Sequence, residues 1–418
     1  MDEAKRRVEA VFRIEWPRLV AGLARFVRGD LDTAEELAQD AFVAALETWP
    51  TDGIPRHPGA WLMQVARNRA LKRIDRQRRW GKNEPEIARA VGERHQRQAE
   101  AIADAADDAI GDDLLRLIFA ACHPSLSDES RVALTLRVVV GLTTEEIASA
   151  FVISEATAAQ RIVRAKRTLA ESEAAFDVPR GPALAERLDS VLDVVYCVFN
   201  EGYVATAGAE WMRPDLCEDA LRLGRVLAEL VPNEAEVHGL VALMEIQASR
   251  LRARTLPDGT PIPLFEQNRA HWDHFLIQRG FAALKRCEVL GGPPGPYLLQ
   301  AAIAACHARA RTPEATDWRL MVTLYDQLGA LSPSPILELN RAVAVSFAAG
   351  PLAALCLVDA LATSPVLQGN HLLPAVRADF LSRLGRRDEA RAELERAASL
   401  TKNERERALL LRRAGLGR

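Results

Sequence analysis

Apolar residues recur at helical spacing along nearly the whole chain. Stretches that alternate apolar and polar residues are missing, and so are the Asn-Gly pairs that often close β-hairpins. Because helices and strands require different apolar periods, a chain that shows only one of these periods is confined to one class of fold. The sequence therefore predicts an all-α protein.

The chain is too long for one compact core. With 418 residues, we expect two or three domains. The shares of hydrophobic residues, 49%, and of charged residues, 27%, are typical of a soluble globular protein. The net charge of −3 does not by itself indicate a nucleic-acid partner, so the distribution of charge along the chain has to decide that question.

Shifts in composition divide the chain into four parts. Residues 1–80 form a first helical unit. Residues 81–112 form a polar, alanine-rich linker that becomes acidic toward its end and could be partly helical. Residues 113–175 form a second helical unit. A stretch rich in Pro and Gly, residues 176–182, separates this unit from a long run of alanine- and leucine-rich helices at residues 182–418.

Residues 143–167 have the pattern of two short helices joined by a tight turn. Thr143 and Glu146 have the spacing of a capping box at the start of the first helix, and Ser154 is placed to cap the second. Val152 occupies the turn position where Gly is usual. The segment therefore predicts a helix-turn-helix whose second helix could enter a DNA major groove.

The second helix keeps a polar and basic face once its apolar positions are buried. Gln can bond adenine edges, Arg can bond guanine in bidentate fashion, and Lys166 and Arg167 are better placed for phosphates. The alternative is a solvated basic face on an ordinary helix. The candidate residues on this face are Glu155, Thr157, Gln160, Arg161, Arg164, Lys166 and Arg167.

A second basic block lies upstream, with Asp75 as its one acidic residue. Such a helix can neutralise phosphate charge, and the tryptophans that bracket it, Trp61 and Trp80, could stack on unpaired bases. A solubilising surface with Trp61 in the core is the alternative. The basic residues of the block are Arg67, Arg69, Lys72, Arg73, Arg76, Arg78, Arg79 and Lys82.

The helix that precedes this block is acidic and carries an amide. We expect it to start near Asp32, which would be its N-cap, with Glu35 in capping-box spacing. Polar side chains then follow one exposed side of the helix and would suit a protein partner. The candidate residues are Glu35, Glu36, Gln39, Asp40 and Val43.

Together these segments resemble bacterial sigma factors of the sigma-70 family, in the extracytoplasmic-function (ECF) group. The likeness covers about residues 5–172. AEELAQDAFVAALETW (residues 34–49) and PGAWLMQVARNRALKRIDRQRR (residues 58–79) are similar to sigma region 2, and the helix-turn-helix unit is similar to region 4.

The resemblance implies a role for each segment. The 35–42 helix would dock on the clamp helices of the RNA polymerase β′ subunit, and the chain would also contact the β flap. The basic helix and the loop at residues 50–58 would open and read the promoter −10 element, with a flipped base held in the loop. The 160–167 helix would read the −35 element, and the linker would run toward the RNA exit path. The −10 residues would be Arg56, Arg67, Asn68, Arg69, Lys72, Arg73, Arg76 and Arg79.

Two stretches near the C-terminus match each other with a period of 36 residues. Arg341 corresponds to Arg377, and small residues repeat at the same interval. The repeated alanine pairs are Ala342 with Ala378 and Ala354 with Ala390. A period in the mid-thirties with small residues at helix crossings suggests helical-hairpin repeats of the tetratricopeptide kind.

The chain also carries motifs, most of them in its C-terminal part, that resemble an ECF subgroup with a long tetratricopeptide-like extension. The resemblance implies that this extension regulates the protein and that no dedicated membrane anti-sigma factor is needed. The motifs are CHPSL (122–126), FNEGY (199–203), DLCEDALRL (215–223), GPYLLQAAIAA (295–305), TDW (316–318) and LNRAVAV (339–345).

Other features argue against cofactors and membranes. The six cysteines are widely scattered, so we expect buried thiols in a reducing cytoplasm rather than a zinc site. The charged first residues are unlike a signal peptide, and no apolar run is long enough to span a bilayer. His271 and His274, with Asp273 between them, offer too few ligands for a metal, so packed or capping histidines are expected. Gly202 is expected to end a helix.

Three hypotheses remain at this point. The first is a promoter-recognition subunit of RNA polymerase that catalyses nothing by itself and binds no cofactor. The second is a dimeric helix-turn-helix repressor with a ligand-binding helical domain, which would have no need of residues 35–79. The third is an α-helical enzyme that uses the region of His271 and His274 and binds a metal.

Overall fold

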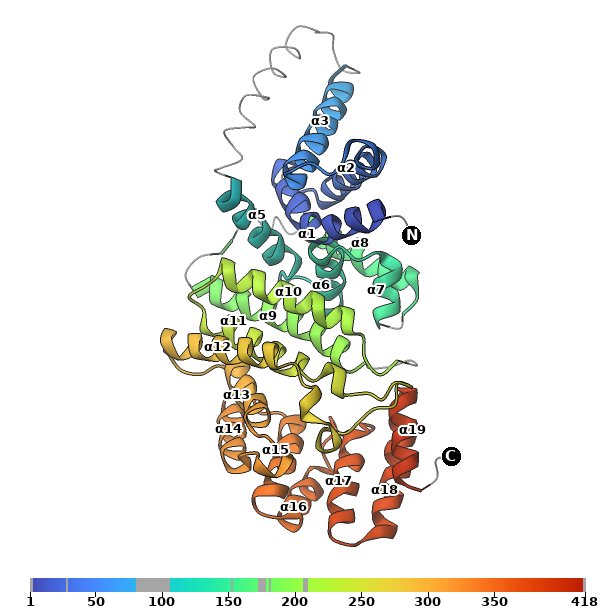
Figure 1. Cartoon of the computed structure of the whole chain (residues 1–418), viewed down its shortest axis with the longest axis vertical. Coiled ribbons are helices and arrows are strands. Elements are labelled where there is room, and N and C mark those ends of the chain that lie inside the picture. The colour runs from blue at the N-terminus through green and yellow to red at the C-terminus, as the bar shows by residue number, and fades with distance from the viewer. Residues whose placement is uncertain are drawn as a thin grey trace. The chain divides into compact units, whose positions relative to one another are not determined.

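The fold is known from a computed structural model that describes residues 3–27, 29–79, 106–151, 153–171, 178–179, 182–205 and 210–415. Within these ranges the secondary structure is helical, apart from one isolated bridge between Thr255 and Pro261 (Figure 1). The prediction of an all-α protein is confirmed. No helix in the described part of the chain combines the length and apolar character needed to cross a bilayer.

The chain forms two compact units. The first comprises residues 1–149 and 153–194, and the second comprises residues 150–152 and 195–418. The division falls inside helix α9 (Pro182–Tyr203) rather than at the Pro- and Gly-rich stretch before it. Arg187 donates to the carbonyl of Phe119 at 2.6 Å and Ser190 donates to that of Cys122 at 2.9 Å, so the first half of α9 is part of the first unit.

The first unit contains the segments with the sequence motifs. Its elements are α1 (Glu3–Phe26), α2 (Leu31–Asp52), α3 (Pro58–Arg79), α5 (Ala106–Ala121), α6 (Asp128–Thr135), the π-helix η1 (Leu136–Val140), α7 (Thr144–Phe151) and α8 (Glu155–Glu171). Helix α1 packs against α2, α3, α5 and η1 and therefore holds the unit together.

Trp16 lies at the centre of this packing. Its buried ring stacks on Phe12 with 4.9 Å between ring centroids, and it lies 6.3 Å from Phe42 of α2. Gly141 ends η1 with φ 88°, and a Cβ atom there would lie 2.9 Å from Trp16 Cδ1. Glycine is therefore required at this position by both conformation and space.

Two local predictions for this unit need correction. The N-cap of α2 is Asp30 rather than Asp32, because Asp30 Oδ1 accepts a hydrogen bond from the amide of Thr33 at 3.1 Å. Helix α2 runs on through Pro50 to Asp52, so the loop before α3 is residues 53–57 and not 50–58. Helix α5 begins at Ala106, within the segment predicted as a partly helical linker. The rest of that segment, residues 81–105, lies outside the described residues.

The second unit is a series of antiparallel helices. They are α10 (Pro214–Leu230), α11 (Ala235–Ala248), α12 (His274–Leu290), α13 (Pro296–Arg309), α14 (Trp318–Leu331), α15 (Pro335–Ala348), α16 (Pro351–Leu361), α17 (Leu372–Arg383), α18 (Arg387–Leu400) and α19 (Glu404–Arg413). Short 3₁₀ turns lie between α11 and α14: η2 (Leu251–Ala253), η3 (Leu264–Glu266), η4 (Arg269–His271) and η5 (Pro313–Ala315). Four of the helices start with Pro, which suits the first helical turn because its missing N–H needs no partner there.

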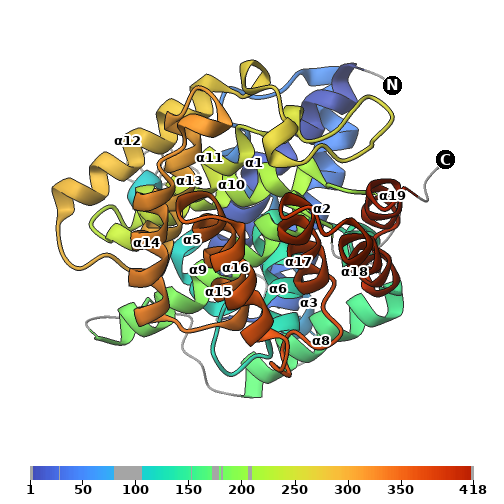
Figure 2. The ribbon, with the colours of Figure 1, turned by 90° about the horizontal axis from the view of Figure 1, so that it is seen from below.

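The 36-residue period corresponds to a repeated pair of helices. Helices α15 and α16 form one pair and α17 and α18 the next, and α19 follows alongside α18 (Figure 2). Arg341 Nε bonds Asp326 Oδ1 at 2.6 Å, and Arg377 Nε bonds Asp359 Oδ1 at 2.8 Å, so each arginine reaches back to the preceding helix. The four alanines that repeat with this period, Ala342, Ala378, Ala354 and Ala390, are all buried.

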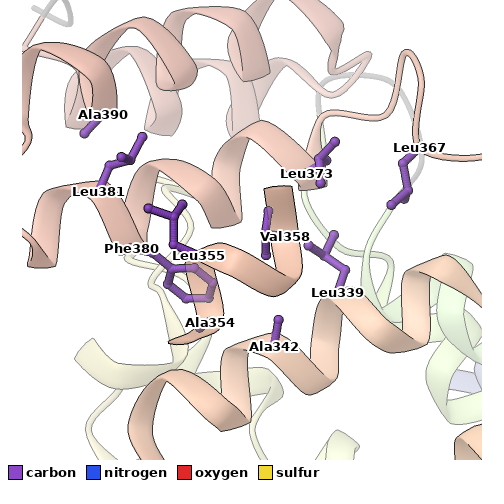
Figure 3. Close-up of a cluster of buried hydrophobic side chains, with 10 residues drawn as sticks. All are labelled: Leu339, Ala342, Ala354, Leu355, Val358, Leu367, Leu373, Phe380, Leu381 and Ala390. Carbon is purple, nitrogen blue, oxygen red and sulfur yellow. The ribbon is translucent and has the colours of Figure 1, made fainter. Parts of the chain in front are cut away.

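An apolar cluster joins the two pairs. Leu339 of α15 and Val358 of α16 lie close to one another, with Leu355 directed toward Phe380 of α17 (Figure 3). Because each pair buries its apolar side against the next, the helices stack as a series.

Two further sequence interpretations are wrong. Gly202 does not end a helix: it lies inside α9, and a Cβ atom there would be 2.7 Å from the backbone nitrogen of Cys217. The cysteines are not all buried, because Cys197 and Cys356 are exposed.

Candidate nucleic-acid interface

The helix-turn-helix is built by local capping. The amide of Thr143 donates to Glu146 Oε2 at 2.7 Å, and the amide of Glu146 donates to Thr143 Oγ1 at 3.1 Å. Ser154 Oγ accepts from the amide of Thr157 at 3.1 Å. Both predicted caps are confirmed, so the helix starts are fixed by the sequence itself.

Helix α8 has one buried face and one open face. Ala158, Ile162 and Ala165 are buried, and α8 packs on α6. Of the candidates for reading the −35 element, Glu155, Gln160, Arg164 and Arg167 are exposed, Thr157 and Arg161 are half-buried, and Lys166 is largely covered.

Two of these side chains have partners on the same helix or at its start. Thr157 Oγ1 lies 2.7 Å from Ser154 Oγ, so its hydroxyl belongs to the cap. Arg167 Nε donates to Glu171 Oε1 at 2.7 Å, and this hydrogen bond raises the pKa of the guanidinium. Gln160 and Arg164 point outward from the helix-turn-helix and therefore form the centre of the candidate base-reading face.

The candidates for reading the −10 element lie on α3 and just before it. Arg56, Arg67 and Asn68 are exposed. Arg69 is tied to α2, since its Nη1 lies 3.2 Å from Asp40 Oδ1 and 2.7 Å from the Asp40 carbonyl oxygen. The remaining candidates, Lys72, Arg73, Arg76 and Arg79, have their backbone in α3, but their side chains fall outside the described residues.

The two tryptophans near this block differ. Trp61 is half-buried and packs against Trp49 with 5.3 Å between ring centroids, which supports the interpretation that it belongs to the core. Trp80 lies outside the described residues.

The candidates for polymerase binding do not all share one exposed side of α2. Glu36 and Gln39 are exposed, and the side chain of Val43 is 49% exposed. Asp40 is half-buried beside Arg69. Glu35 is only 5% exposed and faces the interior of the first unit.

Glu35 lies at the centre of an ion cluster that joins three elements of the first unit. Glu35 Oε2 accepts from Arg137 Nε at 2.9 Å, and Glu35 Oε1 lies 3.0 Å from Lys166 Nζ. Lys166 Nζ also lies 2.6 Å from Asp32 Oδ1. We call Asp32, Glu35, Arg137 and Lys166 the Glu35 cluster. It links the predicted polymerase-binding helix directly to the predicted −35-reading helix.

Arg137 was not identified from the sequence as a functional candidate. It lies in the apolar segment LRVVVG of the π-helix, and its backbone oxygen also accepts from Trp16 Nε1 at 3.3 Å. A lone arginine among apolar residues is a sequence signal for a buried ion pair, because a buried cation needs a carboxylate. Its partner is 102 positions away, so no local pattern reveals the pair.

The described residues contain no group of three or more side chains able to hold a metal ion. His271 and His274 are exposed, and Asp273 between them caps α12 by accepting from the amides of Phe275 and Leu276. The expectation of packed or capping histidines is therefore wrong, since both histidines are exposed and the cap is made by Asp273.

The segments that contain the candidate residues match known families. Residues 15–80 match sigma-70 region 2 and residues 116–169 match sigma-70 region 4. Residues 187–288 match a family of unknown function, DUF6596. The two sigma regions define the class of protein: an RNA polymerase sigma factor, which binds core polymerase and promoter DNA and is not an enzyme.

The likeness to a relative extends over nearly the full length. An uncharacterized protein of Rhizobium meliloti (strain 1021) is 42% identical over 395 residues, which cover 94% of this chain and 92% of that protein. The chain belongs to the same family as that protein. No solved structure matches it.

Proposed function

We propose that this sigma factor belongs to the ECF group and that α2, α3 and α8 divide its work. The exposed side of α2 binds the β′ clamp helices, α3 opens and reads the −10 element, and α8 reads the −35 element. Contact with the β flap completes the attachment to polymerase. The support comes from the matches to regions 2 and 4, which contain these helices.

The open face of α8 is the observation that carries the proposal. Gln160 and Arg164 are exposed opposite the buried Ala158 and Ile162, on a helix whose start is capped. Gln and Arg are the side chains that form bidentate bonds with adenine and guanine in the major groove. The repressor alternative gains no such support, because it does not explain the match of residues 15–80 to region 2.

Run-off transcription with core polymerase tests the proposal. Gln160→Ala and Arg164→Ala should each weaken discrimination at the −35 element by about 1–3 kcal/mol. Arg391→Ala removes an exposed arginine of α18 and serves as the control. The proposal fails if the full chain directs initiation at no genomic promoter, or if the two α8 variants initiate with the selectivity of the control.

We further propose that the C-terminal helices form a tetratricopeptide-like repeat that modulates the sigma activity. The repeated contacts of Arg341 and Arg377 with the preceding helix support the repeat. Small residues at the helix crossings allow close stacking of one pair on the next.

The Glu35 cluster sets a condition for this function. Lys166 cannot bond a DNA phosphate while it holds Asp32 and Glu35, and Glu35 cannot meet polymerase while it is covered. If these residues act as proposed, the first unit must open between α2 and α8 before both interfaces form.

A further inference from the structure

The second unit contains a concentration of arginine and aromatic side chains that the sigma function does not use. Tyr203 ends α9, Arg250 follows α11, Arg254 follows η2, and Arg269 lies in η4. Trp272 precedes α12 and His307 lies near the end of α13. We call Tyr203, Arg250, Arg254, Arg269, Trp272 and His307 the arginine–aromatic cluster.

The three guanidinium groups of the cluster lie against aromatic rings instead of carboxylates. Arg254 Cζ lies 3.6 Å from the centroid of the Tyr203 ring, and Arg269 Cζ lies 4.9 Å from that of Trp272. Arg250 Cζ lies 5.7 Å from both rings. Among the described residues, no carboxylate oxygen lies within 4.0 Å of a nitrogen of these three arginines.

The lack of a paired carboxylate is costly because part of the cluster is buried. Arg254 is only 8% exposed, and its nearest acceptors are the Tyr203 carbonyl oxygen at 3.1 Å and the Met212 sulfur at 3.2 Å. Burying a charge without an opposite charge costs several kcal/mol, as an order of magnitude. Glu314 attracts Arg269 from a greater distance and offsets part of the charge, so the cluster keeps an excess of positive charge.

Three nitrogen atoms of the cluster are also buried without a hydrogen-bond partner. They are Trp272 Nε1, Arg269 Nε and His307 Nδ1. More than nine-tenths of buried polar groups in folded proteins are paired, so three orphans in one place require an explanation. Two of the three can only donate a hydrogen bond, so an acceptor is what the cluster lacks.

The excess of positive charge also affects the protonation of His307. Burial, together with the nearby charges of Arg250 and Arg269, lowers the pKa of His307 to about 3. Burial also lowers the pKa of Arg254 and of Arg269, and Arg250 adds to both effects. A negative charge at this position would offset all of these shifts.

The arginines differ in how firmly they are held. Arg269 Nη1 donates to the carbonyl oxygens of His307 at 2.7 Å and Ala310 at 2.6 Å, which fixes the side chain at the end of α13. Arg250 is half-buried; its Nη2 donates to the Tyr203 hydroxyl, and its other guanidinium nitrogens bond no described residue. The Arg250 guanidinium is therefore held by fewer hydrogen bonds than that of Arg269, and it lies over the Trp272 ring, which carries one of the orphan donors.

We propose that Arg250, Arg269, Trp272 and His307 form a binding site for a small oxyanion, either a phosphate or a carboxylate. The guanidinium fork matches the two oxygens of either group, and the indole N–H supplies a further donor. The site lies wholly within the second unit, so the proposal does not depend on the roles proposed for α2, α3 and α8.

Binding is tested with the full chain and three salts. The melting temperature is measured in sodium phosphate, sodium succinate and sodium chloride at equal ionic strength, and affinity is measured by calorimetry. A bound oxyanion raises the melting temperature in proportion to the logarithm of its concentration, whereas chloride does not. A rise with phosphate alone or with succinate alone identifies the ligand class. An equal response to all three salts, or none, overturns the proposal.

Arg250→Gln tests whether Arg250 binds the oxyanion. Loss of a charge-assisted hydrogen bond should weaken oxyanion binding by about tenfold or more. Arg252→Gln is the matched control, since Arg252 is exposed in the same short turn and lies outside the cluster. Equal affinities for the two variants would rule out Arg250 as a ligand.

Trp272→Phe removes the orphan donor together with the five-membered ring of the indole. Because Trp272 is buried, the smaller side chain leaves a cavity, and without oxyanion this variant should melt below the wild type. With oxyanion, its rise in melting temperature should be smaller than that of the wild type. A rise identical to the wild type's would show that the indole N–H does not hold the ligand and would overturn the proposed site.

Discussion

Glu35 is a carboxylate in an almost fully covered position, and two cations compensate its charge. Arg137 reaches it from the π-helix and Lys166 from α8, at 2.9 and 3.0 Å. A buried ion pair adds little stability over an apolar substitute, but removing one partner leaves the other charge uncompensated. The main effect of losing Glu35 would therefore be to leave the charges of Arg137 and Lys166 uncompensated.

Glu35→Gln should lower the free energy of unfolding by about 3 kcal/mol. The amide keeps the volume but cannot neutralise Arg137 and Lys166. Urea denaturation measures the effect, and Glu47→Gln, an exposed glutamate on the same helix, is the control. If both variants unfold at the same urea concentration, the cluster does not hold α2 to α8.

His307 should make the stability of the protein depend on pH. The pKa of His307 is about 3 in the folded chain and near 6.5 when the chain is unfolded, because burial disfavours the charged imidazole. Above about pH 6.5 both states are neutral and the residue has no effect; between about pH 6.5 and 3 only the unfolded chain binds the proton, so stability falls as pH falls.

The slope from this residue is at most about 1.4 kcal/mol per pH unit. Urea unfolding at about pH 7 and about pH 5 should show a larger loss for the wild type than for His307→Gln. The same loss in both proteins would mean that the imidazole is protonated in the folded chain.

At the scale of single elements, helix caps can be predicted from the sequence where the bonded residues lie within one helical turn of each other. The capping box of Thr143 and Glu146 and the cap at Ser154 are confirmed, because each joins atoms three residues apart. The start of α2 was placed two residues late, because Asp30 and Asp32 both fit a cap and Glu35 fits a capping box. Glu35 instead bonds Arg137, which no local pattern could show.

The same limit applies to the candidate site. The outward positions of Gln160 and Arg164 followed from helical spacing alone. The covered position of Lys166 did not, because its partners lie on α2, 134 positions away in the case of Asp32. Gly202 was misassigned for a similar reason: its small size serves a close contact with a segment beyond its own helix.

Gly202→Ala should destabilise the second unit by about 1–3 kcal/mol. The added methyl would lie 2.7 Å from the nitrogen of Cys217 and 2.9 Å from the oxygen of Arg213, both backbone atoms that cannot rotate away. Thermal unfolding measures the change. Gly329→Ala is the matched control. Gly329 also lies in a helix, but an added Cβ atom there would have no neighbour closer than 3.6 Å. That variant should be neutral or stabilised by up to about 1 kcal/mol.

At the scale of the whole molecule, the division into two units does not coincide with a break in the chain. The first half of α9 belongs to the first unit, where Leu188, Val191 and Leu192 are buried. A sequence boundary drawn at the Pro- and Gly-rich stretch would therefore remove part of the first unit along with the second.

Two truncated chains test whether the first half of α9 stabilises the first unit. A chain that ends at residue 181 loses the bonds of Arg187 and Ser190 to the first unit, and a chain that ends at residue 194 keeps them. We expect the shorter chain to melt at a lower temperature, by several degrees as an order of magnitude. Equal melting temperatures would place α9 outside the folding unit of regions 2 and 4.

The Glu35 cluster bears on the sequence of events at a promoter. Because Lys166 of α8 is bonded to Asp32 and Glu35 of α2, the free chain would bind a −35 element more weakly if α8 reads it as proposed. If polymerase displaces Lys166 when it binds α2, binding to polymerase precedes promoter recognition. Chains that are not bound to polymerase would then leave promoters unoccupied, and sigma factors would compete for polymerase rather than for promoter DNA.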